Sequence, residues 1–387
     1  MKKFLAFVMA ASMALSLAAC GGSSASTATS TTTEATSEAA ASTSGSKTDV
    51  AFVTDVGNID DQSFNQYTWQ GVQDFCSANS LNANYYRPTE DSDAARLEQM
   101  DNAVNDGAKA VVVAGYLFGS SIAEAQAKYP DVEFLALDVS TVDLGDTAPA
   151  ENTALITYKE EQAGYLAGYA AVYDGYKELG FLGGMAVPAV IRYGYGFVQG
   201  ADAAAQELGQ NIDINYFYGG QFYGDANITS RMEGWYSNGT QVVFACGGGI
   251  YTSAVEAALK NNGYVIGVDV DQNYIGANGV ADGTYAYNPF ITSAMKGLSE
   301  AVSTSLSDIE AGEWSTIAAT NGNFGLEDGD YVGLPTDEDS WNFETFTVEE
   351  YEELKQKIAS GEIVVDNSSD DATKPTVSEF TNVTYIQ

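Results

Sequence analysis

The stretch TDVGNIDDQSFN, residues 54–65, decides the fold of this 387-residue chain. It follows the apolar run 50–53, which has the length of a buried strand, and it leads into a segment of helical periodicity near Ser63. A strand, a polar turn and a helix in succession are typical of a parallel α/β sheet. Small ligands bind at the carboxyl ends of the strands in such sheets, so Asp55 and the polar residues after it are candidates for ligand binding.

The same alternation continues through the rest of the body. The run 110–114 is apolar throughout, and 241–245 is apolar after Gln241, which is typical of parallel strands that helices cover on both faces. About 340 residues follow Thr48, more than one ordinary hydrophobic core contains. We therefore expect an α/β protein with two lobes, each a doubly wound parallel sheet. The expected boundaries are a signal peptide at 1–19, a lipidated cysteine and flexible linker at 20–47, lobe 1 at 48–155 plus about 281–311, lobe 2 at about 156–280 plus 312–365, and a peripheral tail at 366–387.

The amino terminus predicts an extracytoplasmic lipoprotein. Lys2 and Lys3 precede an apolar segment at 4–17, and the sequence LAAC then ends at Cys20. This is the pattern of a secretory signal in which Cys20 would become the lipid-bearing first residue. The alternative is an ordinary signal peptide with an incidental cysteine. Residues 21–47 are almost entirely Gly, Ser, Thr and Ala, which predicts a flexible spacer between the cell membrane and the body.

The net charge and the absence of histidine exclude several kinds of binding partner and of catalytic chemistry. The chain has 16 basic and 53 acidic residues and a formal net charge of −37, so nucleic acid and anionic headgroups would be repelled. It contains no histidine, which removes the commonest general base and metal ligand and every Ser-His or Cys-His pair. We expect no cofactor, no metal and no catalytic residue.

Several predicted strands end in residues suited to a polar ligand with a flat ring. Asp55, Asp138 and the segment GVDVD with Asp269 and Asp271 supply carboxylates, while Phe244 precedes the glycines 247–249. Carboxylates accept hydrogen bonds from hydroxyl or amino groups, glycines allow close approach, and aromatic rings stack on flat rings. Each residue alone also has a structural explanation, because such an aspartate often caps a helix and a phenylalanine often belongs to the core.

Longer segments resemble a known family. The chain contains, in this order along residues 53–363, VTDVGNIDDQSFNQYTWQGV, YPDVEFLALD, YKEEQAGYLAGYAA, FLGGMAVPAVIRYGYGF, VVFACGGG, VIGVDVDQ and EELKQKIASGEI. In these segments it resembles the basic membrane protein family of lipoproteins, which are substrate-binding proteins of ABC transporters and include purine nucleoside receptors. The resemblance extends from about Thr48 to Val365 and implies a two-lobed fold of the type I periplasmic-binding-protein kind.

The resemblance also implies roles for individual residues around a purine nucleoside. The implied contacts are Asp55 and Asn65 with the base edge, Phe64 and Phe244 with the two faces of the purine, and Asp138, Gly249, Asp269 and Asp271 with the ribose hydroxyls. Receptors of this family have a lysine in the strand after the GVD motif. The stretch TYAYNPF, residues 284–290, has Asn288 at the position expected for it, which leaves room for a different or modified ligand.

Two other functions are compatible with parts of the sequence. TDVGNIDD resembles the calcium-binding DTDPGIDD signature of nucleoside hydrolases, but Val53 replaces its first aspartate and Asn58 is an insertion. A surface sensor or adhesin that binds another small ligand is the other alternative. The favoured hypothesis is a non-enzymatic, lipid-anchored, monomeric nucleoside receptor that delivers its ligand to an ABC transporter permease.

Overall fold

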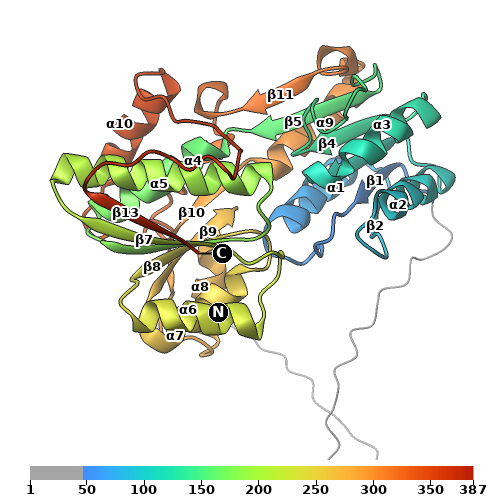
Figure 1. Cartoon of the computed structure of the whole chain (residues 1–387). Coiled ribbons are helices and arrows are strands. Elements are labelled where there is room, and N and C mark those ends of the chain that lie inside the picture. Colours follow the sequence, from blue (N-terminus) through green and yellow to red (C-terminus); the bar gives the residue numbers. More distant parts are fainter. Residues whose placement is uncertain (1–46, 387) are drawn as a thin grey trace, which may run out of the picture. The chain divides into compact units, whose positions relative to one another are not determined.

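The computed structural model describes residues 47–386, which belong to a single unit (Figure 1). The predicted signal peptide, Cys20 and nearly all of the linker fall outside these residues. Among the helices that are described, none combines the length and the apolar composition needed to cross a bilayer. The unit contains two sheets, as expected, and each has helices on both faces.

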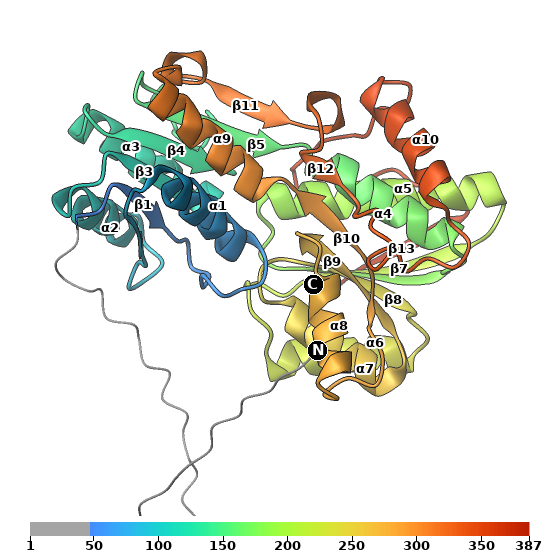
Figure 2. The ribbon, with the colours of Figure 1, turned by 180° about the vertical axis from the view of Figure 1, so that it is seen from behind.

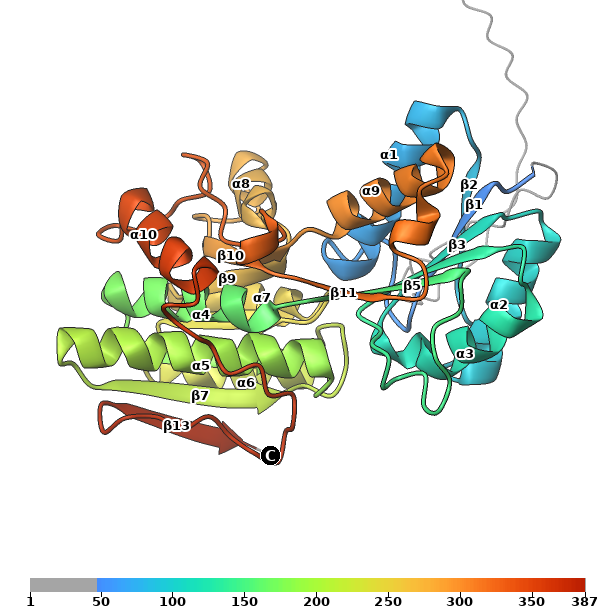
Figure 3. The same ribbon diagram turned by 90° about the horizontal axis from the view of Figure 1, so that it is seen from above.

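The first sheet has six strands, all parallel, in the order β11-β5-β4-β3-β1-β2. Helices α1 (Phe64–Asn79) and α9 (Leu298–Ala311) pack against each other on one face, and α2 (Asp93–Asn105) and α3 (Gly119–Lys128) lie together on the other (Figures 2 and 3). Every residue of β1 is buried, as a strand covered on both faces requires. The strands of this sheet are β1 (Val50–Val53), β2 (Ala83–Tyr86), β3 (Ala110–Ala114), β4 (Glu133–Leu137), β5 (Thr153–Tyr158) and β11 (Asn321–Phe324).

The second sheet has seven strands in the order β12-β10-β9-β8-β6-β7-β13, and only the short β12 is antiparallel to its neighbour. Its strands are β6 (Glu178–Gly183), β7 (Ile212–Tyr218), β8 (Val242–Cys246), β9 (Tyr264–Asp269), β10 (Phe290–Lys296), β12 (Val332–Gly333) and β13 (Thr381–Ile386). Helices α4 (Glu160–Tyr173), α5 (Pro188–Leu208) and α10 (Val348–Ala359) cover one face (Figure 1). Helices α6 (Ala226–Ser237), α7 (Tyr251–Asn261) and α8 (Asn273–Ala281) cover the other.

Helices α4 and α5 approach each other unusually closely. A β-carbon at Gly164 or Gly168 of α4 would overlap the backbone of α5, and one at Gly196 or Gly200 of α5 would overlap the backbone of α4. Only glycine is compatible with this spacing. Nearly every residue of α4 is buried, which explains why this helix is apolar on all sides except at its first turn.

The chain crosses between the sheets after β5, after β10 and after β11 (Figure 3). The crossing segments are hydrogen-bonded to one another, since Lys159 N donates to Phe324 O at 2.8 Å and Gly297 N donates to Tyr331 O at 2.7 Å. These crossings correct the expected boundaries. Strand β10, expected in lobe 1, pairs with β9 of the second sheet, and β11, expected in lobe 2, pairs with β5 of the first. Strand pairing depends on tertiary contacts that local sequence patterns do not encode.

The expected peripheral tail has a defined place in the second sheet. Its last residues form β13, which pairs in parallel with β7 and covers that edge. The ring of Tyr385 in β13 lies 5.1 Å from the ring of Tyr216 in β7. Most residues of β13 are partly or fully exposed, so the polar composition of the tail fits a strand at the edge of a sheet.

Candidate ligand-binding site

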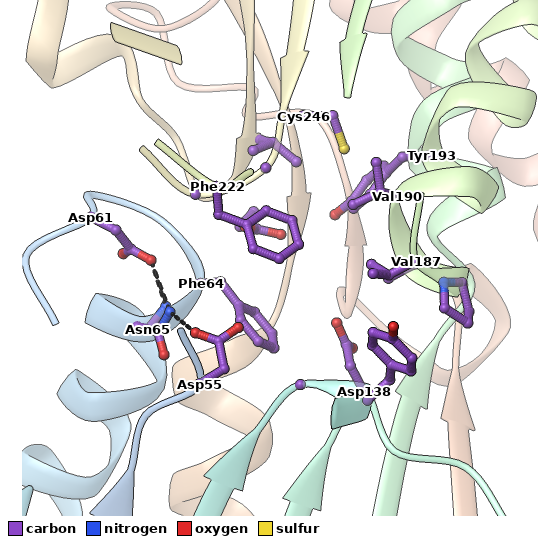
Figure 4. A pocket seen from close by; sticks show the side chains of 18 of the residues that line it. Asp55, Asp61, Phe64, Asn65, Asp138, Val187, Val190, Tyr193, Phe222 and Cys246 are labelled. Carbon is purple, nitrogen blue, oxygen red and sulfur yellow. Dashed lines mark hydrogen bonds between the residues drawn. The ribbon is translucent and has the colours of Figure 1, made fainter. Parts of the chain in front are cut away.

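A cavity lies where the carboxyl ends of strands from both sheets meet (Figure 4). The cavity volume is about 60 Å³, smaller than the roughly 150 Å³ cavity that admits benzene in a protein core. A ligand of nucleoside size therefore requires the lobes or side chains to move apart. Residues that line it include Asp55, Asp61, Phe64, Asn65, Tyr116 and Asp138 from the first lobe and Val187, Val190, Tyr193, Phe222, Gly247, Gly248, Asp269 and Lys296 from the second.

Two of the lining aspartates occupy strained backbone positions directly at strand ends. Asp138 follows β4 with a φ of 55°, and Asp269 ends β9 with a φ of 68°. Left-handed backbone is uncommon for residues other than glycine, and such strain concentrates at functional sites. Both residues line the cavity; the Asp269 side chain is buried, and that of Asp138 is about 10% exposed.

Lys296 joins these aspartates in a buried charge cluster. Its Nζ donates to Asp138 Oδ2 at 2.6 Å and lies 3.8 Å from Asp269 Oδ1 and 3.6 Å from Glu160 Oε1. Burial raises the pKa of Asp138 to about 6, although Lys296 acts in the opposite direction. Burial lowers the pKa of Lys296, but the surrounding carboxylates outweigh this and raise it overall. Burial also raises the pKa of Asp269. The cluster therefore contains a firmly protonated lysine beside two aspartates that ionise less readily than usual.

At the other end of the cavity, Asn65 joins two further carboxylates. Its Nδ2 donates to Asp55 Oδ1 at 3.0 Å and to Asp61 Oδ2 at 3.2 Å (Figure 4). Gly57 N also donates to Asp55 Oδ1, at 2.6 Å. Two acceptors fix the amide orientation, so Asn65 Oδ1 is the atom that remains buried without a partner among the described residues. Asp61 also accepts from Ser63 N at 2.9 Å and from Asn65 N at 3.0 Å, and thereby caps α1.

Two aromatic side chains from opposite lobes border the cavity. Phe64 projects from the first turn of α1, and Phe222 from the loop after β7 (Figure 4). Lys296 Nζ lies 4.6 Å from the centroid of the Phe64 ring, within the range of a cation–π interaction. The Phe222 ring rests against Gly184 and Gly247, where a β-carbon would displace it.

Five of the nine residues proposed for ligand contact line this cavity, namely Asp55, Phe64, Asn65, Asp138 and Asp269. Phe244 does not, which corrects the expected stacking pair. It lies in the middle of β8 with no exposed surface, and its ring centroid is 5.5 Å from those of Phe181 and Phe197. A strand covered on both faces directs such a side chain into the core. Phe222, which lies in an irregular loop without a recognisable pattern, occupies the cavity instead.

The other three proposed residues also lie outside the lining. Gly249 N donates to Phe222 O at 2.9 Å and so supports the loop, while Gly247 and Gly248 reach the cavity. Asp271 accepts from Asn273 N at 3.0 Å and from Ser340 Oγ at 2.5 Å, which makes it a cap of α8.

Asn288 donates to Asn273 Oδ1 at 2.6 Å and accepts from Phe290 N at 3.0 Å, so it supports a turn before β10. Asn288 is therefore not part of the cavity lining. The strand after the GVD motif begins only at Phe290, and Lys296 at its far end reaches the cavity. The sequence signal that could have identified Lys296 is its place as a basic residue at the end of a strand-like run.

No group of three or more cysteine, aspartate or glutamate side chains within residues 47–386 is arranged to hold a metal ion. Asp60, which the hydrolase signature would require, does not line the cavity. Asp61 does line it, but it caps α1 as described above.

Comparison with known proteins identifies the family. Residues 48–369 match the family Bmp, described as ABC transporter substrate-binding protein PnrA-like. The chain belongs to the Bmp family. Bmp proteins are the substrate-binding components of ABC transporters and are not enzymes. The resemblance noted in the sequence is thereby confirmed, and the hydrolase alternative is set aside.

Individual relatives agree with this assignment, and a solved structure shares the fold. A CD4+ T-cell-stimulating antigen of Listeria monocytogenes is 31% identical over 82% of this chain and 87% of its own. The ABC transporter nucleoside-binding protein BmpA of Lactococcus lactis is 30% identical over 62% of this chain and 70% of its own. The crystal structure of an ABC transporter solute-binding protein from Aeropyrum pernix has a TM-score of 0.70 at 22% identity, covering 84% of this chain and 95% of that one. The two-lobed type I fold is thus confirmed.

Proposed function

We propose that this Bmp protein captures a purine nucleoside between its lobes and presents it to the permease of an ABC transporter. The proposal includes attachment to the outer face of the cell membrane through a lipid on Cys20, the only membrane contact. The observation that carries it is one cavity that combines the rings of Phe64 and Phe222 with the carboxylates of Asp138 and Asp269.

The chemistry of a nucleoside matches each part of this cavity. A purine has two flat apolar faces suited to Phe64 and Phe222. Its N–H groups suit Asn65 Oδ1 and Asp55, whose side chains offer acceptors at that end. The ribose hydroxyls can donate to Asp138, whose Oδ1 is buried without a partner among the described residues. The Lactococcus relative, named as a nucleoside-binding protein, supports the same ligand class.

Contacts between the lobes support capture by closure. Ser63 Oγ donates to Asp269 Oδ2 at 2.5 Å, and Gln272 Nε2 donates to Gln62 O at 3.0 Å. Together with the bond from Lys296 to Asp138, they close a cavity too small for a nucleoside. A ligand that contacts both lobes would shift the population between open and closed arrangements.

Isothermal titration calorimetry with inosine, guanosine and adenosine, with free ribose and free nucleobases as controls, tests this proposal. We expect stoichiometric binding of at least one nucleoside with a dissociation constant below about 1 μM, or about −8 kcal/mol, and no release of free base on prolonged incubation. If none of the three nucleosides gives a binding signal, the proposal that the ligand is a purine nucleoside is refuted. A surface receptor for another small ligand would then be favoured. Release of free base would contradict the non-enzymatic assignment.

A further inference from the structure

The start of α4 contains a buried acidic residue that has no part in lining the cavity. Glu160, in the motif KEEQAGYLAG, is the first residue of α4 and has no exposed surface. It lies directly after the first crossing between the lobes. A helix N-terminus favours a negative charge, but a carboxylate this deeply buried also needs cationic partners.

Glu160 has two such partners on different elements. Its Oε2 accepts from Arg192 Nε of α5 at 2.7 Å. Its Oε1 has no hydrogen bond among the described residues and lies 3.6 Å from Lys296 Nζ of β10. Lys296 in turn contacts Asp138 and Asp269 in the cavity. The ammonium group of Lys296 thus connects Glu160 to the carboxylates that line the cavity.

We propose that Glu160 is a positioning residue that holds the Lys296 ammonium between Asp138 and Asp269 and thereby sets the charge that the cavity presents to ligand hydroxyls. An ammonium group has three donors, and three carboxylates from three elements surround this one. Without Glu160, Lys296 would turn fully toward the two aspartates and neutralise the acceptors that a diol needs. Arg192 would lose the carboxylate that its Nε contacts at 2.7 Å.

The charge of Glu160 and its distance from Lys296 affect Asp138 in different ways, which two variants can separate. The charged and titratable groups near Asp138 are Lys296 of β10, Glu160 of α4, Asp269 of β9, Arg192 and Tyr193 of α5, and Tyr158 of β5. Among these, Glu160 raises the pKa of Asp138, since a second negative charge disfavours ionisation. Glu160→Gln keeps the shape and removes the charge, whereas Glu160→Asp keeps the charge and withdraws it from Lys296.

The experiment compares both variants with the wild-type protein, and its ligand arm rests on the proposed function. For Glu160→Gln at pH 7.5 we expect inosine binding to weaken at least tenfold and 2′,3′-dideoxyinosine binding to change less than about twofold. Glu160→Asp should also lose affinity for inosine. Equal losses for both ligands, or unchanged inosine affinity, would overturn the inference, because a purely structural residue would not discriminate between them.

A ligand-free readout keeps the two proposals distinguishable. Carboxyl-carbon NMR, with Asp138 assigned through Asp138→Asn, follows the titration of Asp138 directly. We expect its midpoint to move to lower pH in Glu160→Gln and to stay near the wild-type value in Glu160→Asp. An unmoved midpoint in Glu160→Gln would refute the inference even if nucleosides bind. A shifted midpoint in a protein that binds no nucleoside would refute the proposed function and leave the positioning role supported.

Discussion

Replacing Phe222 by alanine should weaken nucleoside binding without unfolding the protein. The ring borders the cavity from a loop, and the loop's own bond, from Gly249 N to Phe222 O, does not involve the side chain. Losing one stacked aromatic face costs about 1–3 kcal/mol. This corresponds to a dissociation constant raised about 5-fold to about 150-fold. Titration calorimetry at 25 °C measures the change, and circular dichroism checks that the fold is retained.

Phe244→Ala is the matched control, since it removes the same ring from the core. Phe244 has no exposed surface and touches the rings of Phe181, Tyr193 and Phe197. Truncating a phenylalanine in such a position lowers the free energy of unfolding by about 3–5 kcal/mol. Urea denaturation should therefore detect a large loss of stability for Phe244→Ala and a small one for Phe222→Ala. Unchanged nucleoside affinity in a folded Phe222→Ala protein would refute the stacking role of Phe222.

Three further predictions concern the packing, the buried charge and the anchor. Gly200→Ala should lower the unfolding temperature strongly, because the new methyl group overlaps the carbonyl oxygen of Tyr165 in α4. Thermal unfolding followed by circular dichroism measures this, and an unchanged unfolding temperature would contradict the close contact between α4 and α5. Burial, with Glu160 nearby, raises the pKa of Glu161 from 4.5 to about 7, so its contribution to stability is complete below pH 4.5 and declines as the pH rises to 7. Between pH 5 and pH 8 the unfolding temperature of the wild-type protein should therefore fall relative to that of Glu161→Gln, and parallel curves would count against this. Cys20→Ala should abolish lipidation, and mass spectrometry that finds a lipid on the variant would disprove the anchor.

The sequence predicted the site best where a residue directly follows a strand. Asp55, Asp138 and Asp269 were placed at a common edge from the apolar runs before them, and the structure brings all three to one cavity. The rule succeeds because parallel strands end on the same side of a sheet, whatever their order. Strand order itself, and hence the lobe to which β10 and β11 belong, depends on pairing between distant segments and was not predicted.

Residues whose orientation depends on tertiary structure were predicted less well. Phe244 and Phe222 have the same chemistry, but one lies inside a strand buried on both faces and the other in an irregular loop. The strand after the GVD motif begins only at Phe290 and ends at Lys296, a position that the local sequence around Asn288 does not reveal. Asp271 lies only two residues beyond Asp269, yet its carboxylate accepts from Asn273 N and Ser340 Oγ and does not line the cavity.

The three crossings between the lobes limit how the cavity can open. Because Lys159 is bonded to Phe324, and Gly297 to Tyr331, the connecting strands form a single hydrogen-bonded ribbon. Glu327 next to this ribbon forms an ion pair with Lys159 that adds a further cross-link. A ribbon bends easily across its flat face and resists shear within its plane. The two lobes should therefore move by hinge bending about the connecting segments. A ligand would then enter and leave on the side of the cavity opposite those segments.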